Sequence, residues 1–245
     1  MDQVVVVFVA ALITALATGL GALPLLLGRQ IRGRGLGLST AVAAGFMLGA
    51  SAGLFWEGAG VGALRVVVGA LLGGVFIVVT RRLIGDREEV TFGRLRGADA
   101  VGALMIVGVM TVHSFTEGVG VGVAFGGGET LGALITTAIA VHNIPEGLAI
   151  SLVLVPRGVT VLRAAGWSIF SSLPQPLMAV PAFLLVEWFE PFLPVGLGFA
   201  GGAMVWMVAA QLIPDALRTA GPRAVAAATG ISTFGMVALQ ALLLG

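Results

Sequence analysis

Two short segments of this chain carry the same pair of side chains that can bind a metal. His113 precedes Glu117 by four residues, and His142 precedes Glu146 by the same spacing. Residues four apart share one helix face, so each segment would present an imidazole beside a carboxylate. Two such helices packed together would offer two nitrogen and two oxygen ligands, a set that suits a divalent transition metal.

The composition indicates that these helices lie in a membrane. The chain is 58% hydrophobic and 10% charged, with a mean hydropathy of +1.08, whereas a soluble domain carries roughly 25% charged residues. The net charge of +1 provides no basic surface for nucleic acid. Cysteine is absent, which excludes disulfides and thiolate metal sites. We therefore expect an all-α integral membrane protein.

Apolar segments long enough to span a bilayer recur along the chain. A hydrocarbon core takes about 20 apolar residues per helix. Clusters of Arg, Gly or Pro separate eight candidate helices, at about residues 3–27, 37–57, 62–84, 100–125, 130–154, 161–186, 194–218 and 223–244. Residues 85–99 form the one long connection, and we expect residues 1–245 to make a single membrane domain.

The arginines predict how the chain is oriented. All 13 basic residues are Arg, and all but Arg65 fall in or beside the odd-numbered connections. Basic loops face the cytoplasm. Loop 85–99 would then be cytoplasmic and both termini would lie outside. The N-terminus lacks the features of a cleavable signal, so the first segment is expected to be a retained helix.

Other polar residues also fall within the predicted helices. Glu57 and Asp215 lie near helix ends, where an interfacial position explains them equally well. The two His–Glu pairs could be hydrogen-bonded staples between helices without any metal. A membrane metalloenzyme is a further alternative, although the metalloprotease signature His-Glu-x-x-His is absent.

Proline and glycine predict how these helices break and pack. Prolines inside the predicted helices indicate discontinuous helices of the kind that line transporter cores, although structural kinks alone would look the same; they are Pro145, Pro174, Pro176, Pro181 and Pro214. Glycines recur at the four-residue spacing of close helix packing at Gly45, Gly49 and Gly53, at Gly69 and Gly73, and at Gly198 and Gly202.

Several of these segments resemble the ZIP (Zrt/Irt-like) divalent metal transporters, and the bacterial GufA-like branch in particular. The resemblance is carried by residues 142–147 (His-Asn-Ile-Pro-Glu-Gly), 113–118, 44–57, 172–176 and 211–215. It implies a 3+2+3 bundle in which helices 1–3 and 6–8 are inverted repeats. It also implies inward transport of divalent metals by an elevator-type motion, in which helices 1, 4, 5 and 6 move against helices 2, 3, 7 and 8.

The resemblance also assigns site residues. The primary metal site would be His113, Glu117, His142 and Glu146, with Met47 nearby. Relatives often hold a second metal beside the first, but two of its expected ligands are here Ser114 and Gln175, while Asn143 is kept. We therefore expect one metal, or a second of low affinity. Gln211 is neutral where relatives carry an acid, which leaves Asp215 as an entrance or exit ligand.

The expected cargo and partners follow from these ligands. Nitrogen and oxygen ligands without thiolate make the site permissive among zinc, manganese, iron, cobalt and cadmium and poor for Cu(I). The resemblance implies that zinc is the chief cargo. Metal and protons should compete for the site. The resemblance places the chain in a bacterial inner (cytoplasmic) membrane as a multi-pass protein and allows a homodimer.

Overall fold

A computed structural model describes residues 2–26, 33–85, 98–189 and 191–244, and these are helical throughout apart from short turns. The helices are α1 (Gln3–Leu20), α2 (Leu23–Leu26), α3 (Arg34–Gly85), α4 (Ala98–Gly126), α5 (Glu129–Leu154), α6 (Val161–Ser172), α7 (Pro174–Trp188), α8 (Phe192–Met207), α9 (Ile213–Thr219) and α10 (Pro222–Leu244). A 3₁₀ turn, η1 (Val155–Arg157), follows α5, and a π-helical turn, η2 (Val208–Leu212), joins α8 to α9. The expected all-α membrane fold is thus present, while the predicted loop 85–99 lies almost wholly outside the described residues.

Six segments of the described chain are long and apolar enough to cross a membrane. One of them, Arg34–Val79, has 46 residues, about twice what one crossing needs. This segment of α3 covers the second and third predicted helices, and its backbone leaves the helical conformation at Gly62. The count of eight crossings remains a prediction.

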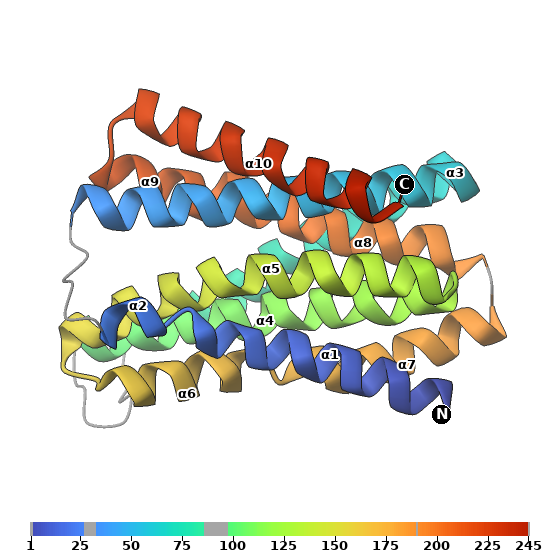
Figure 1. The fold of residues 1–245 in the computed structure, drawn as a ribbon, viewed down its shortest axis with the longest axis horizontal. Coiled ribbons are helices and arrows are strands. Elements are labelled where there is room, and N and C mark those ends of the chain that lie inside the picture. The colour runs from blue at the N-terminus through green and yellow to red at the C-terminus, as the bar shows by residue number, and fades with distance from the viewer. Residues whose placement is uncertain (1, 27–32, 86–97, 190, 245) are drawn as a thin grey trace.

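The chain folds back on itself at Gly62. A Cβ added at Gly58 would lie 2.7 Å from the Val66 side chain, whereas residues eight apart in a straight helix are about 12 Å apart along the axis. The two halves of α3 therefore lie beside each other. Figure 1 shows that the N- and C-terminal ends lie toward the same end of the bundle, as an even number of crossings requires.

Three of the predicted helices are divided. The first ends at Leu20, and a tight turn leads to α2. Pro24 has no N–H that could continue the helical i→i−4 hydrogen bonds across this turn. The sixth breaks at Leu173, between α6 and α7. The seventh widens into η2 one turn before Pro214, which lacks the N–H for a regular i→i−4 bond. Pro145 and Pro181, by contrast, lie inside continuous helices.

The helices form two groups, both visible in Figure 1. In the first group, α1, α5, α6 and α7 surround α4, and in the second, α8, α9 and α10 pack on α3. The groups meet where α4 packs on α8 and where α5 packs on α3. The first group corresponds to predicted helices 1, 4, 5 and 6, and the second group to predicted helices 2, 3, 7 and 8. These are the sets that the resemblance assigned to a moving and a static bundle.

Glycines allow helices to approach at backbone contact, as the four-residue spacing predicted. An added Cβ at Gly202 would lie 2.4 Å or less from backbone atoms of Ala70, and one at Gly49 would meet Met236 and the Thr233 carbonyl. Gly73 contacts the Phe199 backbone in the same manner. Such contacts replace the hydrophobic driving force that is missing between helices in lipid.

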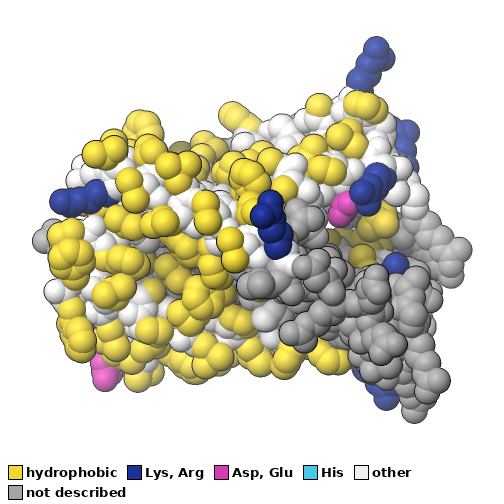
Figure 2. Space-filling view, turned by 180° about the vertical axis from the view of Figure 1, so that it is seen from behind, with side chains coloured by type: hydrophobic (Ala, Val, Ile, Leu, Met, Phe, Trp, Pro, Cys, Tyr) yellow, Lys and Arg dark blue, Asp and Glu magenta, His cyan; other side chains and the backbone are white. Residues whose placement is uncertain are grey.

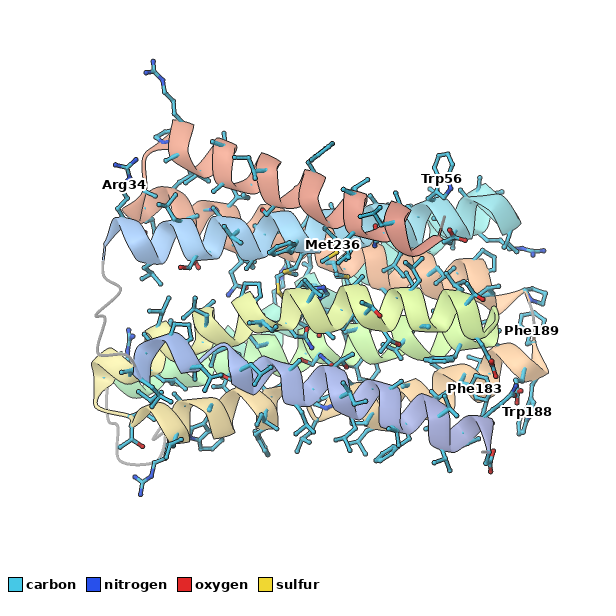
Figure 3. All side chains as sticks on the ribbon, viewed as in Figure 1. Arg34, Trp56, Phe183, Trp188, Phe189 and Met236 are labelled. Carbon is cyan, nitrogen blue, oxygen red and sulfur yellow. The ribbon has the colours of Figure 1, made fainter. Side chains whose placement is uncertain are left out.

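The surface is that of a membrane protein with distinct ends. Figure 2 shows hydrophobic side chains over most of the visible face, with arginines gathered mainly toward one end. Arg34 lies at that end, whereas Trp56, Trp188 and Phe189 lie at the other (Figure 3). Trp56 and Trp188 are highly exposed, and exposed tryptophans are typical of a membrane interface.

Candidate metal centre

The two His–Glu pairs meet between α4 and α5. His113 and Glu117 come from the middle of α4, and His142 and Glu146 from the middle of α5. One ligand atom from each of the four residues can be chosen so that all lie within 4.8 Å of one another. Four ligands about 2.1 Å from a tetrahedral ion are roughly 3.4 Å apart, so small side-chain shifts would close this group around a cation.

Glu117 lies at the centre of the cluster. Its Oε1 is 3.2 Å from His113 Nε2 and also accepts a hydrogen bond from His142 Nε2. Both imidazoles therefore converge on one carboxylate oxygen. A divalent cation placed there would compete with protons for the carboxylate and the rings.

The cluster is fully buried and has unused bonding capacity. None of the four side chains is more than 1% exposed. Both carboxylate oxygens of Glu146 and Nδ1 of both histidines have no hydrogen-bond partner among the described residues. A buried carboxylate without partners is costly, and a bound cation is the partner that its two free oxygens suit.

A second layer of polar side chains supports Glu117. Gln175 Nε2 donates to Glu117 Oε2 at 2.5 Å. The side-chain oxygen of Gln175, Oε1, accepts a hydrogen bond from Asn143 Nδ2 at 3.3 Å. It also lies within bonding distance of the Thr14 hydroxyl, whose proton is shared with the Ala11 carbonyl at 2.7 Å. Asn143 Nδ2 also donates to the backbone carbonyl of Thr14 at 2.8 Å. Helices α1, α4, α5 and α7 thus contribute to one hydrogen-bonded network.

Local sequence explains how Gln175 reaches Glu117. The break at Leu173 starts a new helix, α7, with Pro174 in its first turn and Gln175 directly after it. Gly118, the residue after Glu117, has no side chain to hold α7 away. A Cβ there would lie 2.8 Å from Gln175 Cα, closer than packed carbons approach.

The remaining predicted site residues lie in different surroundings. Ser114 is buried, and its Oγ has no hydrogen-bond partner within the described part of the chain. Met47 is fully buried in the main hydrophobic core. Gln211 lies in η2, and Asp215 is exposed and pairs with Arg218 at 3.2 Å. Metal-ligand roles for these four remain predictions.

Thr14 is the residue that sequence reasoning missed. It lies fully buried in the middle of the apolar α1. The available signal was a pair of threonines, Thr14 and Thr18, at the spacing of one helix face within an otherwise apolar segment. Which helix would receive that face could not be read from the spacing.

The fold and the site together define a class: polytopic helical membrane proteins with a buried site that can hold a divalent cation. Within that class, the model of the ZIP zinc transporter family matches residues 88–244. The chain belongs to the ZIP zinc transporter family, as its resemblance indicated.

Curated relatives agree with this assignment. The chain is 36% identical to the zinc transporter GufA of Myxococcus xanthus over 228 residues, which cover 86% of this chain and 88% of GufA. It is 48% identical over 231 residues to a protein of Arabidopsis thaliana named "Putative zinc transporter". The matched region covers 93% of this chain but only 37% of that protein. The zinc transporter ZIP11 of Homo sapiens is 37% identical over 127 residues, 46% of this chain and 35% of that protein.

Proposed function

We propose that this chain carries divalent transition-metal cations across a membrane, zinc first, with cadmium, manganese, iron and cobalt as further cargo. The observation that carries the proposal is the buried cluster of two imidazoles and two carboxylates, in which both Glu146 oxygens lack hydrogen-bond partners among the described residues. Family membership and relatives named as zinc transporters support transport over a membrane enzyme.

The ligand set fits a cargo that must be captured and then released. Two carboxylates offset the charge of a +2 ion, and two neutral imidazoles complete four ligands. Borderline nitrogen and hard oxygen ligands bind many divalent metals without the very tight hold that thiolates give to soft metals. His113, Glu117, His142 and Glu146 are the residues to which we assign the cargo.

The motion we infer is a displacement of the group α1, α2 and α4–α7 against the group α3 and α8–α10. All four cargo ligands and their hydrogen-bonded supports belong to the first group. The contact of α4 with α8 places small residues opposite each other, with a Cβ at Gly120 only 3.2 Å from Ala200 Cβ. We infer that the two groups slide along this contact. Uptake would then run toward the arginine-rich end of the chain, in a bacterial inner membrane.

The test is metal uptake into sealed proteoliposomes that contain the purified chain. Zn²⁺ and Cd²⁺ uptake should be saturable, and should be lost in Glu146→Gln and in the double variant His113→Ala/His142→Ala. Glu187→Gln is the matched control, because Glu187 is exposed on α7, and it should keep wild-type uptake.

The opposite result is equally informative. Wild-type uptake in Glu146→Gln would remove the site from the transport path. If the wild-type chain retains one tightly bound metal but moves none, the site is catalytic or structural.

A further inference from the structure

The orientation of the Asn143 and Gln175 side-chain amides beside the metal centre is fixed by a backbone carbonyl, which can only accept hydrogen bonds. The backbone carbonyl of Thr14 accepts from Asn143 Nδ2 at 2.8 Å, so Asn143 must turn its NH₂, and not its oxygen, toward Thr14. The same NH₂ lies 3.3 Å from Gln175 Oε1. Gln175 must therefore present its oxygen to Asn143.

The orientation of Gln175 follows. With the Gln175 oxygen turned toward Asn143 Nδ2, the Gln175 NH₂ lies 2.5 Å from Glu117 Oε2. A carboxylate can only accept a hydrogen bond, so the Gln175 NH₂ must be the donor to Glu117, which agrees with the orientation that Asn143 imposes on Gln175. The relay runs from α1 through α5 and α7 to α4, and each member has one allowed orientation.

We infer that Asn143 and Gln175 are positioning residues, and that the N–H they hold on Glu117 limits the pocket to a single divalent cation. Glu117 Oε1 faces the two histidines, while Oε2 faces the positive end of the Gln175 amide. A second cation beside Oε2 would meet that N–H dipole at close range. Rotation of the Gln175 amide to offer its oxygen would break the hydrogen bond from Asn143 Nδ2.

Burial makes this restriction strong. Thr14, Asn143 and Gln175 are all fully buried, so no water replaces a hydrogen bond that a rotated amide loses. The relay also aims Glu117 Oε1 at both imidazoles before an ion arrives, which pre-organises the site. This inference rests on the proposed function, because it concerns the same pocket.

The experiment is to count bound ions on the purified full chain by equilibrium dialysis with Cd²⁺ followed by metal analysis. We expect one Cd²⁺ per chain for the wild type and two for Gln175→Glu, in which a carboxylate replaces the blocking amide. Gln240→Glu is the matched control, since Gln240 is also buried but lies on α10, and it should stay at one. Thr14→Val should also stay at one, because Asn143 still holds the amide.

A second variant decides the matter if Gln175→Glu does not fold. Asn143→Asp has no side-chain N–H to give to Thr14 or Gln175, so the relay is released and a second ion should bind. Two ions on the wild type, or one ion on every folded variant of Gln175 and Asn143, would overturn the inference while leaving transport intact. A wild type that binds no Cd²⁺ and transports none would instead sink the proposed function together with this inference.

Discussion

Gly147, one residue after Glu146, controls the distance between α1 and α5. A Cβ at this position would overlap the carbonyl oxygen of Thr18 and would lie 2.7 Å from its carbonyl carbon. The substitution Gly147→Ala should therefore damage the metal centre although Gly147 carries no ligand atom.

The size of the effect follows from these distances. Ordinary contact begins at 3.4 Å, so α1 and α5 must separate by at least about 0.7 Å from the carbonyl carbon alone. Thr14 lies one turn before Thr18, and its 2.8 Å bond from Asn143 would lengthen to about 3.5 Å, which is no longer a hydrogen bond. Overpacking and the lost buried bond together cost about 3 kcal/mol.

Thermal unfolding in detergent measures this cost. For a chain of this size, about 3 kcal/mol corresponds to a midpoint lower by roughly 6–12 °C, and Cd²⁺ affinity should fall as well. Gly166→Ala is the control, since a Cβ on this α6 glycine meets nothing within 4 Å, and its midpoint should not fall. A wild-type midpoint and wild-type Cd²⁺ affinity for Gly147→Ala would refute the reasoning.

Three further outcomes are expected. Ala200→Leu should abolish uptake but leave Cd²⁺ binding intact, because the larger side chain would block movement at the contact of α4 with α8. The control Ala227→Leu, at an exposed position on α10, should change neither uptake nor binding. Uptake by both variants would contradict sliding. Zn²⁺ uptake should fall as the pH is lowered, since protons compete with the metal for its ligand atoms, and uptake that rises instead would exclude that competition. Cu(I) should compete with Zn²⁺ uptake poorly, because the site has no sulfur ligand among its four residues; strong inhibition by Cu(I) would point to ligands outside the cluster.

The sequence predicted much of the local structure. The i, i+4 spacing placed each His beside its Glu, and the structure brings both pairs into one cluster. Glycine spacing predicted the close helix contacts, and composition predicted an all-helical membrane protein. These features depend on periodicity and hydrophobicity, which can be read along the chain.

The features that could not be predicted depend on packing between distant residues. Nothing in the local pattern indicates that Thr14, 161 residues before Gln175, would hold its amide. The break at Leu173 and the widened turn at Val208–Leu212 lie beside Pro174 and Pro214, as the prolines suggest, whereas Pro145 and Pro181 lie inside continuous helices. Proline alone therefore does not say which helices break, because packing against neighbouring helices also decides where the backbone departs from regular geometry.

The end of the bundle that carries Trp56 and Trp188 has almost no connecting chain. Two residues link α4 to α5, three link α7 to α8, and α3 turns at Gly62. Among the described residues, that face presents helix ends and tight turns to a protease or a membrane-impermeant reagent. Arg34 lies at the opposite, arginine-rich end (Figure 3), and the chain has no cysteine of its own. A membrane-impermeant thiol reagent that labels Arg34→Cys from one side of a sealed vesicle and Trp56→Cys from the other would reveal which way the chain is inserted.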